Sequence, residues 1–253
     1  MLLYPAIPYI VIVLFGLLIG SFLNVCMLRI PAGESIVTAP SHCPRCLKKL
    51  RWFELIPVFS WLFLSGRCNG CKSPISAQYP LVEASTGILF AIIYNRFGFS
   101  IETLLYCSMT SALLALSVID FRTLEIPEGF IYFLLAVGIA RVVTDVGSWS
   151  LYLIGAGAVG LPLLLILLIS GGRGVGGGDV KLMAVCGLIL GWKLIILAFF
   201  LGCVLGSIIH LLRMVITRTG HQLAFGPYLS MGIFIAALWG GGLINAYLAL
   251  FLL

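Results

Sequence analysis

The amino-acid sequence predicts an all-α fold, a polytopic membrane bundle of about eight transmembrane helices. Of the 253 residues, 61% are hydrophobic and 9% are charged, whereas a soluble domain carries about 25% charged residues. Apolar runs of about 20 residues, the length that crosses a bilayer, recur along the chain. The sequence of a membrane β-barrel would instead consist of short segments of alternating polarity, which this sequence does not display.

The apolar segments divide the chain into a first helix, one long polar region and a helical core. The eight segments are 5–28, 80–96, 101–119, 129–147, 150–170, 180–191, 194–212 and 228–252. The sixth is short for a span, so we expect it to be tilted or continuous with its neighbour. We expect a first transmembrane helix at 1–28, a loop domain at 29–79 and a core at 80–253. The first run lacks a small-residue cleavage site, which favours a retained helix.

Basic residues predict the orientation. If the connections alternate from an outside N-terminus, twelve of the fifteen lysines and arginines fall on one side. The other side holds Arg96, Arg141 and Lys193. Because basic loops stay in the cytoplasm, we expect the first side, with the loop domain, to be cytoplasmic. The net charge of +6 then reflects topology, and no nucleic-acid partner is expected.

Two of the three aspartates fall at the cytoplasmic boundary. Asp120 ends the third segment and Asp179 begins the sixth, whereas Asp145 lies in a loop on the opposite side. Two carboxylates in one site do not ionise equally, because repulsion raises the pKa of one of them. The ionised member can take a proton from water, and the protonated member can polarise a carbonyl and protonate a leaving amine. Such a pair indicates peptide-bond hydrolysis without a covalent intermediate.

The stretch before the second aspartate, "GGRGVGGGD" at 171–179, is rich in glycine. Glycine backbone can approach an extended substrate closely, and the helix dipole favours an ionised Asp179. In the alternative interpretation, Asp120 and Asp179 only cap or flank helix ends, Lys181 is a cytoplasmic anchor and the glycines form a loose loop. A phosphate-binding loop is excluded, because "GXXXXGK[ST]" is absent and an adjacent aspartate repels anions.

The polar region contains two Cys-x-x-Cys pairs, Cys43/Cys46 and Cys68/Cys71. Each pair can present two thiolates to one tetrahedral ion, and four thiolates form a closed, structural Zn²⁺ site. Disulfides are not expected on the reducing cytoplasmic side. The alternatives are reduced cysteines without a metal, or replacement of one ligand by His42. With zinc, 29–79 would be a small zinc-ribbon-like domain.

Further motifs surround the cysteines and the aspartates. In order along the chain they are "GSFLNV" at 20–25, "RIP" at 29–31, "PISAQYPLVE" at 74–83, "DFRTLEIPE" at 120–128, "GGGDVKL" at 176–182 and "FGPYL" at 225–229. With the double cysteine motif, this set resembles the type IV prepilin peptidases, the bacterial leader peptidase/N-methyltransferase family. The likeness covers nearly the whole chain, and the order and spacing make it specific.

The resemblance implies a GxGD-type intramembrane aspartic protease of the bacterial inner membrane. By motif match, Asp120 and Asp179 are the catalytic pair, with Gly176, Gly178 and Lys181 in support. The implied substrates are prepilins or pseudopilins, membrane-embedded proteins whose basic leader precedes a hydrophobic helix and is cut after glycine. Many members then methylate the new N-terminus, with S-adenosylmethionine as co-substrate.

Three residues bear on the second activity or depart from the family. Glu83, at the cytoplasmic start of the second segment, is a candidate for methyl transfer or substrate binding, or else an interfacial residue paired with an arginine. Leu55 stands where the family often has asparagine, and Glu128 where an aspartate is common. Neither departure changes Asp120 or Asp179, the catalytic pair. Leu55 bears on the expected methyltransferase activity.

Other functions stay open at this point. The chain could be a peptidase without methyltransferase activity, or a zinc-ribbon membrane scaffold or cation transporter without peptidase activity. A transporter more often places its carboxylates at mid-membrane in broken helices, whereas both aspartates here belong to one face.

Overall fold

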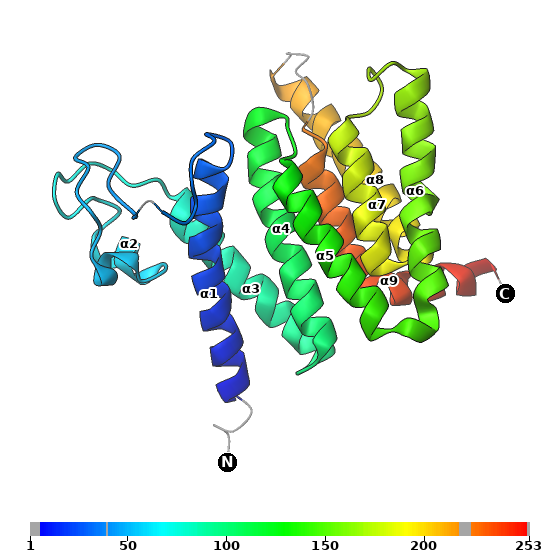
Figure 1. Cartoon of the computed structure of the whole chain (residues 1–253), viewed down its shortest axis with the longest axis horizontal. Coiled ribbons are helices and arrows are strands. Elements are labelled where there is room, and N and C mark those ends of the chain that lie inside the picture. Colours follow the sequence, from blue (N-terminus) through cyan, green and yellow to red (C-terminus); the bar gives the residue numbers. More distant parts are fainter. Residues whose placement is uncertain (1–5, 39, 218–223, 252–253) are drawn as a thin grey trace. The chain divides into compact units, whose positions relative to one another are not determined.

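The computed structural model describes residues 6–38, 40–217 and 224–251 (Figure 1). In this part of the chain the secondary structure is helical without strands, and two isolated β-bridges lie beside the cysteines. The elements are α1 (Ala6–Arg29), η1 (Trp52–Leu55), α2 (Phe59–Phe63), α3 (Gln78–Phe97), α4 (Ile101–Thr123), α5 (Glu128–Thr144), η2 (Val146–Ser148), α6 (Trp149–Ile169), α7 (Gly177–Leu190), α8 (Trp192–Thr217) and α9 (Gly226–Phe251). The predicted all-α fold is confirmed.

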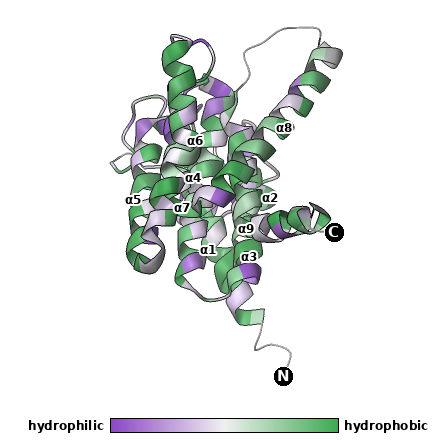
Figure 2. Cartoon of the chain, turned by 90° about the vertical axis from the view of Figure 1, so that its right-hand side faces the viewer, coloured by the Kyte–Doolittle hydropathy of each residue, from purple (hydrophilic) through white to green (hydrophobic). Residues whose placement is uncertain are grey.

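Each of the eight predicted apolar segments forms one helix, α1 or one of α3 to α9. Among the described residues, five helical stretches are long and apolar enough to cross a membrane: Ala6–Arg29, Ile101–Thr123, Val146–Ile169, Trp192–Leu212 and Gly226–Leu250. Figure 2 shows hydrophobic residues along much of the length of the helices. The chain is therefore a multi-pass membrane protein, and the count of eight spans stays a prediction.

Some predicted features lie outside the described residues. These are Pro5 and Leu252, at the ends of the first and last predicted segments, and Arg218, one of the twelve basic residues expected in the cytoplasm.

The first of two compact units, Met1–Thr103, is built on the pairing of α1 with α3. Glycine lets the two backbones approach closely. A Cβ on Gly16 would lie 2.7 Å from Cα of Gly87, and one on Gly20 would lie 2.7 Å from Cα of Glu83. Small residues at such contacts are typical of helix pairs in membranes. The segment with η1, α2 and the four cysteines belongs to this unit.

The second unit, Leu104–Leu253, contains α5 to α9 and nearly all of α4. Helix α7 packs against α5 and α6, and α8 packs against α9. A Cβ on Gly187 would lie 2.2 Å from the carbonyl oxygen of Gly155, so α6 and α7 touch backbone to backbone. Residues of α7 such as Leu182 and Cys186 are fully buried. This packing fixes the N-terminal end of α7, which carries Asp179.

Candidate active site and metal centre

Asp120 lies in the last turn of α4 and is only 5% exposed. Its Oδ2 accepts a hydrogen bond from the backbone N–H of Gly226 at 2.8 Å. Helix α4 ends just beyond it, where Leu124 has a φ of 57° and donates its N–H to the carbonyl oxygen of Asp120. Gly226 is the first residue of α9, so the carboxylate is held between two helix ends.

Asp179 lies in the first turn of α7, which Gly176 precedes as the N-cap in an extended conformation. The carboxylate accepts a hydrogen bond from the backbone of Gly176 and interacts electrostatically with Asp120. The structure therefore brings together the two aspartates that the sequence places at one boundary. Asp145 is engaged differently, because it accepts a hydrogen bond from the hydroxyl of Tyr152 at 2.7 Å.

The glycines before Asp179 meet different surroundings. A Cβ on Gly178 would lie 2.9 Å from Cβ of Ile126, so α7 begins in close contact with the α4–α5 connection. A Cβ on Gly176 would lie 3.0 Å from Oδ2 of Asp179. Gly177 faces open space. Close approach within the protein thus crowds position 178, whereas a Cβ at position 176 would require a small shift of the Asp179 carboxylate.

Lys181 forms an ion pair with Glu128, the first residue of α5. Both side chains are 52% exposed. The pair links α7 to the start of α5. A pair this exposed contributes little to stability, so Lys181 makes only a weak structural link between the two helices.

Gly226 is a site residue that sequence reasoning missed. The motif "FGPYL" contains the signal, because a proline at the second helical position, here Pro227, favours a helix start. A helix start offers unpaired N–H groups and a positive dipole end to a carboxylate. The identity of that carboxylate could not be read, since 106 positions separate the two residues.

The four cysteines lie on two knuckles of the same construction. In the first, the N–H of Cys43 donates to the carbonyl oxygen of Lys48 at 3.0 Å, and in the second the N–H of Cys68 donates to that of Ser73 at 2.9 Å. The residue after the second cysteine of each knuckle has a positive φ: Leu47 at 57° and Lys72 at 58°. The two sequence repeats thus fold into two matching turns.

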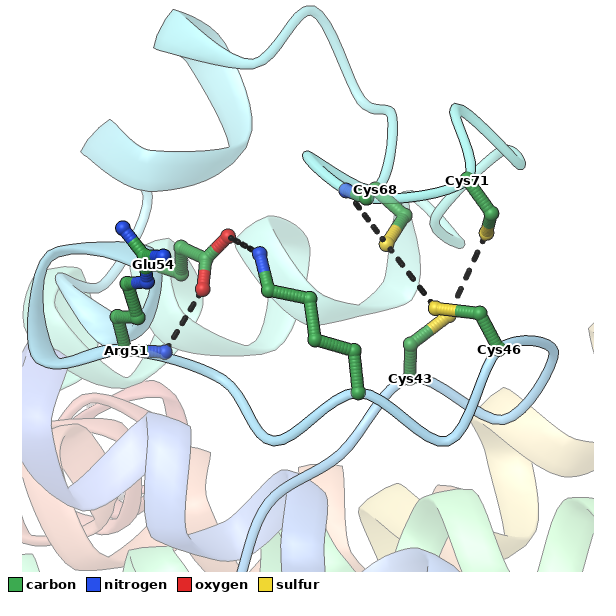
Figure 3. A network of polar contacts seen from close by, with 8 residues as sticks. Cys43, Cys46, Arg51, Glu54, Cys68 and Cys71 are labelled. Atoms are coloured by element: carbon green, nitrogen blue, oxygen red, sulfur yellow. Dashed lines mark hydrogen bonds and ion pairs between the residues drawn. The ribbon is translucent and has the colours of Figure 1, made fainter.

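The cysteine cluster fits a tetrahedral metal ion. Its four Sγ atoms lie within 4.8 Å of one another. Cys43 and Cys71, and likewise Cys46 and Cys68, have sulfurs 3.9 Å apart (Figure 3). Zn–S bonds of about 2.3 Å in a tetrahedron place neighbouring sulfurs about 3.8 Å apart. The backbone N–H groups of Cys46 and Arg45 lower the pKa of the Cys43 thiol to about 6, which favours the thiolate that a metal needs.

The carboxylate of Glu54 lies beside the two cysteine knuckles (Figure 3). Its carboxylate accepts hydrogen bonds from the N–H of Arg51 at 2.7 Å and from Nζ of Lys48 at 3.1 Å. Asn69 of the second knuckle is a third partner. These donors, chiefly the Arg51 N–H, hold the pKa of Glu54 below its usual range. The sequence alone does not identify the partners of Glu54, because the folded loop brings them together.

Glu83 is 6% exposed in the first unit. Its Oε2 accepts a hydrogen bond from the N–H of Val58 at 2.6 Å, and Ser21 is a second partner. Val58 has a φ of 63°, a rare conformation for a β-branched residue. Within the described residues, none of the contacts of Glu83 is with a basic side chain. The side chain ties the loop domain to α1 and α3, and its part in methyl transfer stays a prediction.

Fold and sites together define a multi-pass membrane protein with two interacting carboxylates at helix ends and a four-cysteine cluster that fits a metal ion. Two family models match the chain: Bacterial Peptidase A24 N-terminal domain over residues 14–97, and Type IV leader peptidase family over residues 107–211. No solved structure matches it.

Curated relatives extend the match to nearly the whole chain. A prepilin leader peptidase/N-methyltransferase of Bacillus subtilis (strain 168) is 37% identical over 241 residues, covering 94% of this chain and 97% of the relative. One of Pseudomonas aeruginosa is 35% identical over 266 residues, covering 93% and 92%. The chain belongs to the type IV leader peptidase family, as its motifs predict.

Proposed function

We propose that this protein removes the basic leader of type IV prepilins or pseudopilins, cutting after glycine with Asp120 and Asp179, and then N-methylates the new N-terminus. The observation that carries the proposal is the electrostatic interaction of the two carboxylates, held at the ends of α4 and α7. The names of the relatives support both the substrate class and the second activity.

In the proposed reaction the two carboxyl groups share one proton. The ionised aspartate takes a proton from a water molecule, whose oxygen forms a bond to the scissile carbonyl carbon. The protonated aspartate donates a hydrogen bond to the carbonyl oxygen and then gives its proton to the leaving nitrogen as the C–N bond breaks. The products are a free leader carboxylate and a mature N-terminus with a free amine.

The surroundings of the dyad suit an extended peptide. Gly176 carries no side chain between its backbone and the carboxylate of Asp179, and an extended substrate needs such backbone partners near a membrane. Lys181, paired with Glu128, holds the start of α7 against α5. The hydrophobic helix of the substrate would remain in the lipid beside the apolar helices.

The cysteine cluster is proposed to hold Zn²⁺ through Cys43, Cys46, Cys68 and Cys71. Bound zinc would cross-link the two knuckles, and its four thiolates leave no open position for chemistry. We assign 1–28 to a first transmembrane helix, 29–79 to the zinc-binding loop domain and 80–253 to the protease core. Methyl transfer from S-adenosylmethionine is assigned to the loop domain and its flanking motifs, with Glu83 as a candidate residue.

The proposed location is the bacterial inner membrane, with the N-terminus outside and the dyad at the cytoplasmic face. The excess of basic residues on one side supports this orientation. Prepilin leaders are basic, so a cytoplasmic dyad meets the leader on the side where positive charge is retained.

The test is mass spectrometry of a co-expressed prepilin, which reports the cut site and any added methyl group. Asp120→Asn and Asp179→Asn should each lower the cleavage rate by about a thousandfold or more, because general acid–base catalysis is lost. Asp145→Asn is the matched control and should cleave normally, since Asp145 binds Tyr152 instead. A mature pilin made by either dyad variant at the normal rate would refute the proposal and favour the scaffold or transporter alternative.

A further inference from the structure

Helix α9 begins at the carboxylate of Asp120. The N–H of Gly226, its first residue, is one of the groups at a helix start that have no partner within the helix. It donates to Oδ2 of Asp120 at 2.8 Å in buried surroundings. Within the described part of the chain, the Asp120 carboxylate accepts this hydrogen bond through Oδ2, and its Oδ1 is available to water or to the carboxyl group of Asp179.

A side chain at position 226 would crowd the carboxyl group of Asp120. A Cβ there would lie 2.7 Å from Oδ2, 3.1 Å from Cγ and 3.3 Å from Cβ of Asp120. The first two distances join the Cβ to the carboxyl group itself, so relief requires that this group turn or shift. Asp120 has little room to do so, because only 5% of the residue is exposed.

We propose that Gly226 is a positioning residue of the active site, whose backbone N–H fixes the orientation of the Asp120 carboxylate and stabilises its ionised form. The positive end of the α9 dipole acts in the same direction. A hydrogen bond from a backbone N–H favours the charged form of a carboxylate. The inference rests on the proposed dyad and adds a third helix, α9, to the two that carry it.

The expected consequence is kinetic. A reacting group displaced by about 1 Å can lose about a hundredfold in rate, because attack depends on geometry. Gly226 contacts the carboxylate of Asp120 and makes no proposed contact with the substrate. Its substitution should therefore lower kcat and leave KM nearly unchanged, whereas a general loss of folded enzyme would lower the amount of active protein and both activities together.

The experiment compares Gly226→Ala with Gly129→Ala in the purified full chain, using a prepilin peptide. Gly129 is the second residue of α5, and a Cβ there meets nothing within 4 Å. Gly226→Ala should lower kcat for cleavage by about a hundredfold, keep KM within about twofold, and keep methylation of a peptide that is already cleaved. Gly129→Ala should match the wild type. A wild-type kcat in Gly226→Ala overturns the inference.

If Gly226→Ala folds poorly, a double variant still tests the inference. Asp120→Ala removes the carboxyl group that the new methyl would strike. If the contact is as described, Gly226→Ala lowers the unfolding temperature in the wild type and has little effect in the Asp120→Ala background. An equal loss in both backgrounds overturns the inference. The proposed function fails separately, through normal cleavage by Asp120→Asn, so the two failures are distinguishable.

Discussion

The cysteine cluster and the aspartate pair are two sites of opposite construction. The four cysteines lie within residues 43–71, on two turns that repeat each other's hydrogen bonds and backbone angles. The aspartates come from α4 and α7, and one of them is held by α9. The first site is specified by local sequence and the second by the packing of helices. We therefore expect the two sites to respond differently to the same kind of damage.

The largest effect should follow from removing the metal. Cys43→Ser with Cys68→Ser, or a strong chelator, should abolish metal binding and unfold the loop domain, because a structural zinc site contributes on the order of 10 kcal/mol to local folding. Elemental analysis and limited proteolysis between residues 40 and 75 measure the two losses.

Leader cleavage is the control that separates the two sites. If the dyad depends on helix packing alone, the cysteine variants should keep cleavage within about tenfold of the wild type, a barrier change of about 1.4 kcal/mol, while methylation is lost. Changing Cys46 alone should give the same result, because three thiolates hold the ion less well. A purified wild-type protein without bound metal, or complete loss of cleavage, would contradict this separation.

An intermediate effect should follow from crowding the start of α7. Gly178→Ala places a methyl 2.9 Å from Cβ of Ile126, and overpacking of this kind costs about 1–3 kcal/mol. We expect a lower unfolding temperature and slower cleavage, because the strain lies next to Asp179. Gly177→Ala is the matched control, with open space at its Cβ.

The double variant Gly178→Ala with Ile126→Ala sharpens that comparison. Shortening Ile126 removes the atoms beyond its Cβ that crowd the new methyl at 3.2 Å and 3.3 Å. Part of the lost stability should return relative to the sum of the single changes. If Gly178→Ala and Gly177→Ala behave alike, the α4–α5 connection does not constrain α7 as described.

The smallest effect should follow from breaking the Lys181–Glu128 pair. Both side chains are half exposed, so Lys181→Met and Glu128→Gln should each lower the unfolding temperature only slightly. A double-mutant cycle should give a small coupling that falls with added salt. A large coupling that is insensitive to salt would mean that the pair is shielded from solvent.

Prediction from sequence succeeded where the determining contacts are short-range. Apolar length alone predicted eight helices, and the spacing of Cys43, Cys46, Cys68 and Cys71 predicted their cluster. The meeting of Asp120 with Asp179 was predicted from topology, because helix ends on one face of a membrane share a plane. The partners of Glu54 and Gly226 were not predicted, since each depends on side-chain or backbone atoms that folding alone brings within hydrogen-bond distance.

By itself, the sequence determined the membrane-helical class and picked out the four cysteines that cluster and the two aspartates, because hydrophobic length and residue spacing act over one helix or one turn. Tertiary structure alone decided which glycines are crowded by a neighbouring atom and which backbone N–H groups hold each aspartate. Glycine looks the same at positions 177, 178 and 226 of the sequence. Only the distance to a neighbouring atom, set by how the helices pack, tells an open position from one where a single methyl group would strike Ile126 or Asp120.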